Sequence, residues 1–311
     1  MTQFKKIIFI VGPTAIGKSE VATLIAKKIP SEIISCDSMQ IYKEIQIASN
    51  KPSLKIREDI VHHLLDIVSV TQKFDVASFN QLARQVIETI HSRNRLPLVV
   101  GGSGLYMQIL LDGIFEERME NLSLREELLE RAQDQGPEKL YHELKLKDPA
   151  AAAKLHPNDL KRVVRALEVC LSQQGPISQL QKKRQGLWGH CDIKIFGLNC
   201  ERKSLYQIIN QRVDRMFEQG LIDEIQAIED LPLSQTAQGI IGIKEVRGFL
   251  DGDYSLEEAK ELMKRNTRRL AKRQLTWFRK EKRIQWFETD NTSLDHIAER
   301  ISRAIYEKNF K

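Results

Sequence analysis

Short apolar runs recur along the chain and predict the strands of a parallel sheet. Helical periodicity fills most of the intervals between these runs. Strands that alternate with helices are joined by crossover connections, so the pattern predicts an α/β fold with a parallel sheet. The predicted strands are Ile7–Val11, Glu32–Cys36, Leu96–Val100, Ile193–Leu198 and Ile284–Phe287.

One long stretch, from Phe115 to His190, interrupts this alternation. It has no strand pattern, and X-Pro pairs at Gly136, Asp148, His156 and Gly175 divide its helical segments. We therefore expect a helical insertion domain at residues 115–190, within a core formed by residues 1–114 and 191–311.

Composition excludes several classes of protein. The chain has 311 residues, of which 41% are hydrophobic, enough for a substantial core. The four cysteines lack the spacing of a zinc site or a disulfide framework. No apolar stretch approaches the roughly 18 residues of a membrane span. We expect a cytoplasmic protein with no membrane partner, acting as a monomer.

A phosphate-binding motif follows the first predicted strand. Residues 12–19 match GxxxxGK[ST], here called the phosphate loop, and a helix is predicted from about Lys18. In such a loop the backbone N–H groups point inward, the lysine adds a full charge and the serine can bind Mg²⁺. The motif therefore predicts a site for a diphosphate or triphosphate group. Its members are Gly12, Pro13, Thr14, Ala15, Ile16, Gly17, Lys18 and Ser19.

The phosphate loop alone does not identify the reaction, and a nucleotide-dependent kinase or ATPase is the first hypothesis. Such proteins usually have an Asp at the end of another core strand, but Leu96–Val100 leads into Gly101-Gly102-Ser103-Gly104. The strand that does end near a carboxylate is Glu32–Cys36, followed by Asp37. Asp37 is then either a metal ligand or a base beside the phosphates.

Positive charge is concentrated in one segment near the C-terminus, Lys264–Arg283. It holds ten basic residues and one acid, a net charge of +9, so the rest of the chain carries −3 of the total of +6. This concentration suits a nucleic-acid backbone, although a solvated helix that binds nothing is the alternative. Met263, Leu270 and Trp277 recur at intervals of seven and predict the buried face of this helix.

A second basic cluster lies in the expected insertion, at Lys161, Arg162 and Arg165. Basic clusters in two separate regions favour a groove between them for nucleic acid.

Ordered motifs along nearly the whole chain resemble the bacterial tRNA dimethylallyltransferase family. Besides the phosphate loop, they include Asp37-Ser38-Met39-Gln40-Ile41-Tyr42, His62-His63-Leu64-Leu65-Asp66 and Gly101-Gly102-Ser103-Gly104-Leu105-Tyr106. The later ones are His156-Pro157-Asn158-Asp159, Arg212-Val213-Asp214 and Ala271-Lys272-Arg273-Gln274-Leu275-Thr276-Trp277. This family has a P-loop NTPase-like core.

The resemblance implies transfer of a dimethylallyl group from dimethylallyl diphosphate to N6 of the adenosine 3′-adjacent to the anticodon, in tRNAs that read codons beginning with U. The phosphate loop would then hold an isoprenoid diphosphate with Mg²⁺, bound through Ser19. The expected catalytic residues are Asp37 as general base, Arg212 for the leaving diphosphate, and Ser103; Lys18 of the phosphate loop would also stabilise the diphosphate. The residues expected to contact the tRNA anticodon stem-loop are Asp37, Ser38, Met39, Gln40, Ser103, Arg125, Lys161, Arg162, Arg165, Lys244, Lys272, Arg273, Trp277 and Arg279. From the helical pattern alone, Trp277 would instead be a core residue.

Three departures from the family pattern stand out. Ser103 replaces a frequent Thr and keeps the hydroxyl, and Ala48-Ser49-Asn50 replaces Gly-Thr-Ala. Ile243 replaces a usual Tyr, which removes a ring expected near the RNA surface.

Three other functions are compatible with parts of the pattern. They are an adenylate dimethylallyltransferase acting on free nucleotide, a small-molecule P-loop kinase that binds ATP, and a non-catalytic RNA-binding protein.

Overall fold

The structure, a computed structural model, describes residues 5–114 and 121–307 and consists of two compact units. The first contains residues 1–111 and 188–311, and the second contains residues 112–187. The insertion was expected at 115–190, so each observed boundary lies three residues earlier. Phe115, the expected first residue of the insertion, lies outside the described residues.

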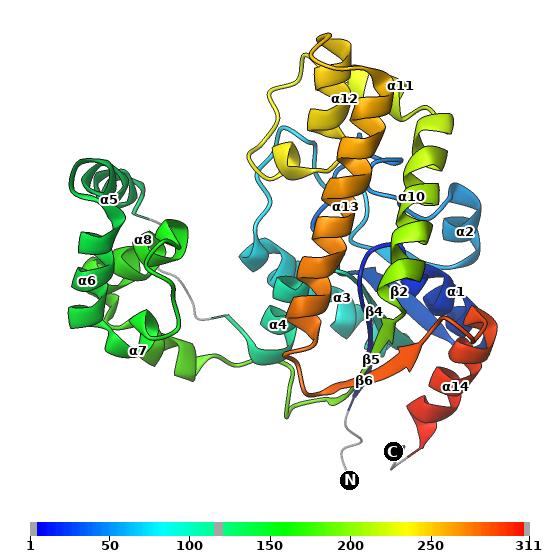
Figure 1. The fold of residues 1–311 in the computed structure, drawn as a ribbon. Helices are drawn as coiled ribbons and strands as arrows, with labels where there is room; N and C mark the ends of the chain where they lie inside the picture. The colour runs from blue at the N-terminus through cyan, green and yellow to red at the C-terminus, as the bar shows by residue number, and fades with distance from the viewer. Residues whose placement is uncertain (1–4, 115–120, 308–311) are drawn as a thin grey trace. The chain divides into compact units, whose positions relative to one another are not determined.

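The first unit is built around a six-stranded parallel sheet with the strand order β3-β2-β4-β1-β5-β6 (Figure 1). This confirms the predicted α/β fold and all five predicted strands. The edge strand β3 has only two residues, too few for any periodicity to reveal it. The strands are β1 (Lys6–Val11), β2 (Ser31–Ser35), β3 (His62–His63), β4 (Leu96–Gly101), β5 (Asp192–Asn199) and β6 (Ile284–Glu288).

Helices cover both faces of the sheet and extend beyond its carboxyl edge. On one face α1 packs against α14, where Val21, Ala22 and Ile25 join Ile297 and Ile301 in one core. Beyond that edge, α10, α11, α12 and α13 form a helical layer (Figure 1). These helices are α1 (Lys18–Lys28), α2 (Leu54–Asp59), α3 (Val76–Ser92), α4 (Gly104–Asp112), α10 (Arg202–Glu218), α11 (Leu221–Gln226), the 3₁₀ turn η3 (Ala237–Gly239), α12 (Ile243–Leu250), α13 (Leu256–Phe278) and α14 (Leu294–Tyr306).

The second unit contains helices joined by turns, with no strand among its described residues, and has its own core. Leu128, Leu140, Leu144, Val163 and Leu167 are all fully buried there. Prolines begin two of its helices, because a proline at the first helical position loses no hydrogen bond. Its helices are α5 (Leu122–Gln135), α6 (Pro137–Lys147), α7 (Pro149–Ala152), α8 (Leu160–Val169), the π-helical turn η1 (Cys170–Gln174), α9 (Ile177–Leu180) and the 3₁₀ turn η2 (Gln181–Lys183).

The buried face of α13 differs from the predicted stripe. Its buried residues are Ala259, Met263, Thr267, Ala271 and Phe278, whereas Leu270 and Trp277 are half-buried. Small side chains allow α13 to lie close to its neighbours, and a search for large apolar residues overlooks them. The prediction was therefore right for Met263 and wrong for the other two positions.

No helix within residues 5–114 and 121–307 combines the length and the apolar character that crossing a membrane requires.

Candidate active site

A cavity of about 790 Å³ lies at the carboxyl ends of the strands, and the first unit alone supplies its walls. Parallel strands present their carboxyl ends at one edge, which is where α/β proteins generally bind ligands. Thirteen of the predicted site residues line it. They are Thr14, Ala15, Ile16, Gly17, Lys18, Ser19, Asp37, Ser38, Met39, Gln40, Ser103, Arg212 and Arg273.

The phosphate loop leaves β1 at the centre of the sheet and has a backbone that requires glycine. Gly12 has φ 145° and Gly17 has φ 91°, both in the region that favours glycine. A Cβ atom at Gly12 would also lie 2.6 Å from the carbonyl oxygen of Leu198. The loop therefore curls tightly against the end of β5 and leads directly into α1.

Lys18, the first residue of α1, lies partly buried at the base of this loop. Its Nζ donates a hydrogen bond to the carbonyl oxygen of Pro13 at 2.6 Å. Burial lowers the pKa of Lys18 to about 8, the nearby Asp37 carboxylate opposes the shift, and Arg212 adds to it. The ammonium group therefore stays charged at neutral pH and provides positive charge within the loop.

Arg212 reaches the phosphate loop from α10, in the second half of the sequence. Its Nη1 donates to the hydroxyl of Thr14 at 2.8 Å. Burial lowers the pKa of Arg212 to about 10, and Asp37 again opposes the shift. Within the described structure its buried Nε has no hydrogen-bond partner. Two cations thus converge on one part of the cavity, which favours an anionic ligand there.

Backbone hydrogen bonds between the residue after β2 and the end of β4 bring Asp37 and Ser103 to the same side of the cavity. The amide of Cys36 donates to Val100 at 2.8 Å, and the amide of Ser103 donates to Cys36 at 3.2 Å. Gly101 allows this approach, because a Cβ atom there would lie 2.0 Å from the carbonyl oxygen of Cys36. Asp37 Oδ1 accepts from the amide of Met39 at 2.9 Å, which orients the carboxylate.

Gln40 has a different environment from the one expected of an RNA contact. Its Oε1 accepts from the hydroxyl of Ser35 at 2.8 Å, and its Nε2 donates to the carbonyls of Ser49 and Asn50, both at 3.3 Å. The carboxamide is therefore engaged in holding the loop after β2, although it also lines the cavity.

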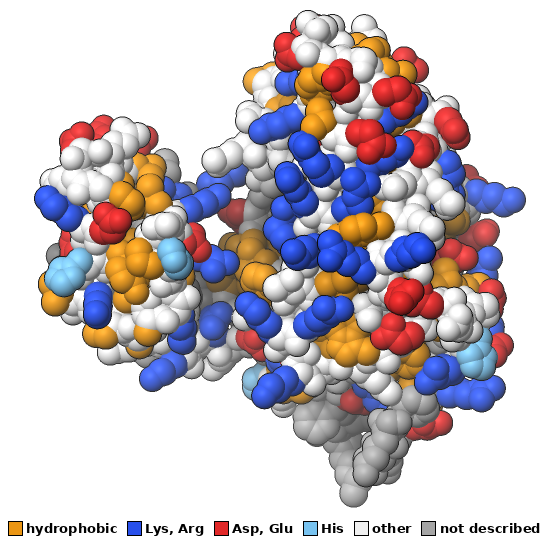
Figure 2. All heavy atoms as spheres, viewed as in Figure 1, with side chains coloured by type: hydrophobic (Ala, Val, Ile, Leu, Met, Phe, Trp, Pro, Cys, Tyr) orange, Lys and Arg blue, Asp and Glu red, His pale blue; other side chains and the backbone are white. Residues whose placement is uncertain are grey.

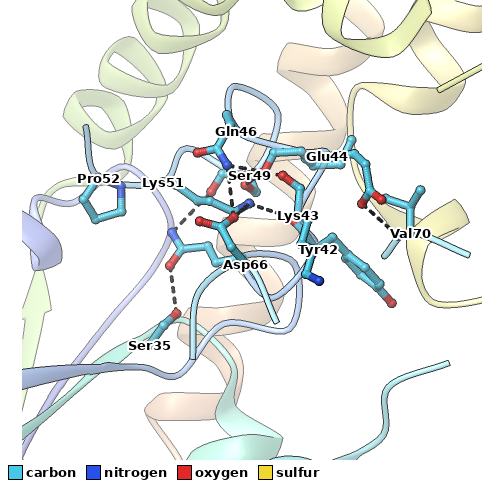
Figure 3. Close-up of polar contacts among 12 residues, drawn as sticks. Ser35, Tyr42, Lys43, Glu44, Gln46, Ser49, Lys51, Pro52, Asp66 and Val70 are labelled. Carbon is cyan, nitrogen blue, oxygen red and sulfur yellow. Dashed lines mark hydrogen bonds and ion pairs between the residues drawn. The ribbon is translucent and has the colours of Figure 1, made fainter. Parts of the chain in front are cut away.

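The same loop is held by charged side chains that the sequence did not indicate. Lys51 and Arg57 both pair with Asp66, at 2.5 Å each. Lys51 also donates to the carbonyl of Tyr42, and Figure 3 shows Lys51 between Tyr42 and Asp66. Glu224 of α11 accepts from three successive amides, those of Gln46, Ile47 and Ala48, at 2.6, 2.7 and 2.9 Å. The donors and Glu224 are more than 170 positions apart, so no local pattern could have revealed the contact.

The cavity also has an apolar wall that sequence reasoning missed. Four parts of the first unit contribute apolar side chains to this wall: the loop after β2, helix α10, the segment that precedes α12, and helix α13. The wall provides room for a hydrocarbon group beside the phosphate loop. Its apolar residues are Met39, Val213, Met216, Ile240, Ile241, Met263 and Leu270. Gln274 of α13, which the resemblance placed in the motif 271–277 and in a segment expected to contact tRNA, also lines the cavity.

The basic segment Lys264–Arg283 presents most of its charges to solvent, and Figure 2 shows basic side chains gathered along α13. Three of its charges are instead used within the protein, and one of them is Arg283, which pairs with Glu281 at 2.6 Å. Lys264 pairs with Asp214 at 2.8 Å, and Arg268 donates to Asn210 at 2.6 Å. The exposed members are Arg265, Arg269, Lys272, Arg273, Arg279, Lys280 and Lys282.

Two other residues predicted to contact RNA in this unit lie outside the cavity lining. Lys244 is exposed at the start of α12. Trp277 is half-buried and lies over Gly104, where a Cβ atom would be 2.2 Å from its Cδ1. Trp277 therefore has a packing role at the start of α4 and keeps a partly accessible ring.

In the second unit, the predicted RNA-contact residues fall into two groups. Lys161 and Arg162 are exposed on α8. Arg125 and Arg165 pair with Glu168, each at 2.8 Å, and the side chain of Glu168 is only 2% exposed. These two arginines stabilise a buried carboxylate, and both pairs hold the pKa of Glu168 below its usual range against the effect of burial.

The expectation about Ile243 was wrong. Its side chain is 1% exposed and belongs to the core of the first unit, because it begins α12 on that helix's inner face. The replacement of the family's Tyr by Ile243 therefore affects packing in the core. A second departure from the family pattern is Ala48-Ser49-Asn50. There the hydroxyl of Ser49 donates to the carbonyl of Ile45 at 2.8 Å, and Asn50 has φ 49°.

The fold and the site together define a P-loop α/β protein whose cavity joins an anion cradle, an oriented carboxylate and an apolar wall. A family model described as IPP transferase matches residues 40–281. The chain belongs to this family, which confirms the resemblance noted in the sequence.

Individual relatives agree over nearly the whole length. The tRNA dimethylallyltransferase of Thermodesulfovibrio yellowstonii is 42% identical, with 97% of this chain and 98% of that protein covered. The crystal structure of a tRNA isopentenylpyrophosphate transferase from Bacillus halodurans has a TM-score of 0.71 at 38% identity and covers 97% of this chain and 95% of that one. A eukaryotic dimethylallyltransferase studied while acting on tRNA has a TM-score of 0.82 at 31% identity, covering 96% and 77% of the two chains.

Proposed function

We propose that this protein transfers a dimethylallyl group from dimethylallyl diphosphate to N6 of the adenosine 3′-adjacent to the anticodon, in tRNAs that read codons beginning with U. One observation carries the proposal: Lys18 and Arg212, both held against the phosphate loop, line one cavity together with the Asp37 carboxylate. The relatives, named for dimethylallyl or isopentenyl transfer to tRNA, support the same chemistry.

In the proposed reaction, N6 of the adenine attacks the first carbon of the dimethylallyl group. The N–C bond forms while the bond from that carbon to the diphosphate oxygen breaks, and the bonding electrons leave with diphosphate. N6 must lose a proton because the exocyclic amine is a weak nucleophile. Asp37 accepts this proton, and the hydrogen bond from the amide of Met39 orients its carboxylate for the purpose.

The leaving diphosphate gains negative charge as the bond breaks. Lys18, the amides of the phosphate loop and the N-terminus of α1 meet this charge from one side, and Arg212 meets it from α10. The apolar wall, with Met216 and Met263 among its members, accommodates the dimethylallyl group and limits access of water.

Mg²⁺ suits the chemistry of the donor groups at this site. Ser19 is exposed in the first turn of α1 and lines the cavity beside the phosphate loop, so a hydroxyl oxygen is available. Mg²⁺ commonly takes one or two protein oxygens and completes its shell with phosphate oxygens and water. When bound, the ion would neutralise charge on the diphosphate.

The acceptor adenosine must leave the stacked anticodon loop to enter the cavity, as enzymes that modify bases generally require. Arg269 and Lys272 on the exposed face of α13 are suited to contact the RNA backbone. Lys161 and Arg162 give the second unit a basic surface of the same kind.

The test is a transfer assay with purified protein, Mg²⁺, labelled dimethylallyl diphosphate and unmodified tRNA, without ATP. We expect label in the RNA at one adenosine and release of one diphosphate for each group transferred. A parallel reaction with AMP in place of tRNA tests the free-nucleotide alternative. Transfer that strictly requires ATP, or label in AMP and none in tRNA, contradicts the proposal.

A further inference from the structure

Gln274 lies on α13, and its carboxamide joins two segments of the cavity wall. Its Oε1 accepts from the backbone amide of Thr14 at 2.8 Å, and its Nε2 donates to the carbonyl of Gly102 at 3.1 Å. These partners are 260 and 172 positions away along the chain. A single side chain therefore ties the phosphate loop to the segment after β4.

The close fit around Gly102 shows how tightly this carboxamide is held. A Cβ atom at Gly102 would lie 2.4 Å from Nε2 of Gln274 and 3.6 Å from the carbonyl oxygen of Gly12. The position accepts only glycine while Gln274 keeps its place. The next residue along the chain is Ser103, whose amide binds the carbonyl of Cys36 beside Asp37.

Thr14 is engaged on two sides as a result. Its amide binds Gln274, and its hydroxyl accepts from Arg212 at 2.8 Å. A continuous set of hydrogen bonds thus runs from Arg212 through Thr14 and Gln274 to Gly102. One end of it belongs to the anion cradle, and the other end adjoins the carboxylate side of the cavity.

We propose that Gln274 is a positioning residue for the transfer reaction: it fixes the spacing between the diphosphate cradle and the Asp37–Ser103 side of the cavity. The inference rests on the proposed function, since it concerns the distance between leaving group and base. Bond formation depends steeply on such distances, and a displacement of about 1 Å can cost on the order of 100-fold in rate.

Gln274 performs this role from a helix that also carries the exposed charges of Arg269 and Lys272. The carboxamide itself is directed at protein backbone on the inner side of α13. Its removal should therefore alter the chemical step and leave RNA affinity unchanged.

The experiment compares wild type with Gln274→Met, which keeps the length of the side chain and removes both hydrogen bonds. Gln85→Met, at an exposed glutamine of α3, is the matched control. Single-turnover transfer is measured with both substrates saturating, together with the Kd for tRNA and the thermal stability of each protein. For Gln274→Met we expect a rate constant lower by about 10-fold to 100-fold and a Kd for tRNA within about two-fold of wild type.

Gly102→Ala provides an independent variant, since its methyl group displaces the Gln274 carboxamide. It should lower the same rate constant, and the double variant should be no slower than the slower single one, because both changes break one connection. If Gln274→Met does not fold, Gly102→Ala still tests the same connection.

Four outcomes would contradict the positioning role of Gln274 or the proposed function. A wild-type rate in Gln274→Met, while wild type transfers normally, removes only this inference. A lower thermal stability with a normal rate for the folded protein reduces Gln274 to a structural residue. Weaker tRNA binding with a normal rate at saturation makes it an RNA contact. Absence of transfer by wild type and Gln85→Met instead refutes the proposed function.

Discussion

Arg212 donates a hydrogen bond to the hydroxyl of Thr14 at 2.8 Å, although the two residues are 198 positions apart in the sequence. The contact brings a guanidinium group from α10 to the phosphate loop, whose own motif supplies Lys18. The loop motif accounts for only one of the two cations that line this part of the cavity.

Replacing Arg212 by Gln should therefore slow transfer strongly while the protein stays folded. Loss of one donor that stabilises charge in a transition state costs about 100-fold to 1,000-fold in rate. Lys203→Gln, on the exposed surface of the same helix, is the control. Single-turnover assays measure the difference, and equal rates for the two variants would show that Arg212 has no role in the chemical step.

Asp37→Asn should abolish most of the transfer activity and leave tRNA binding within about two-fold of wild type. An amide cannot accept the proton of N6, and loss of a general base typically costs 100-fold to 10,000-fold, as an order of magnitude. Asp59→Asn, at the exposed end of α2, controls for the substitution. If Asp37→Asn instead loses Mg²⁺ binding, measured by titration calorimetry, Asp37 is a metal ligand.

The binding of inorganic diphosphate should weaken as the pH rises through about 8. Burial lowers the pKa of Lys18 to about 8, so its ammonium group is charged below that pH and neutral above it. The ligand only gains negative charge over the same range, which makes the direction of the change specific to the protein. Calorimetric titrations between pH 7 and about pH 9.5 test this, and a constant or rising affinity contradicts it.

The exposed charges of α13 should contribute to RNA affinity, and the internally paired ones should not. We expect Arg269→Ala and Lys272→Ala each to weaken tRNA binding and to reduce the slope of log K against log salt by about 0.7 to 0.9. Lys264→Ala is the matched control, because Lys264 pairs with Asp214 at 2.8 Å. Equal slopes in all three variants would exclude this face of α13 from the RNA interface.

Glu224→Gln should loosen the loop after β2. The carboxylate accepts from three successive amides, and a carboxamide cannot provide equivalent charged acceptors. We expect the free energy of unfolding to fall by about 1–3 kcal/mol and proteolysis within residues 46–53 to become faster. Asp223→Asn, on the exposed side of α11, should match wild type in both measurements.

The sequence by itself determined the features that depend on neighbouring residues. Five strands followed from apolar runs, and the phosphate loop from a contiguous motif at 12–19, because periodicity and short motifs are local properties. The position of Asp37 beyond a strand end was equally readable. So was the concentration of charge in Lys264–Arg283, since composition needs no fold.

Only the tertiary structure decided which distant residues meet. The contacts of Arg212 with Thr14, of Gln274 with Thr14 and Gly102, and of Glu224 with the loop after β2 join segments more than 170 positions apart. The physical reason is that chain topology and packing bring these groups together, and a local pattern carries no record of a partner that lies on another element.

The same reason explains the predictions that failed or changed meaning. Ile243 is buried, and Leu270 and Trp277 lie beside the buried face of α13, because neighbouring helices determine which face of a helix is covered. Arg125 and Arg165 carry charge that the sequence assigned to RNA, but the fold places a buried carboxylate, Glu168, between them. Local sequence thus determined which chemical groups the protein has, and the fold determined what each one faces.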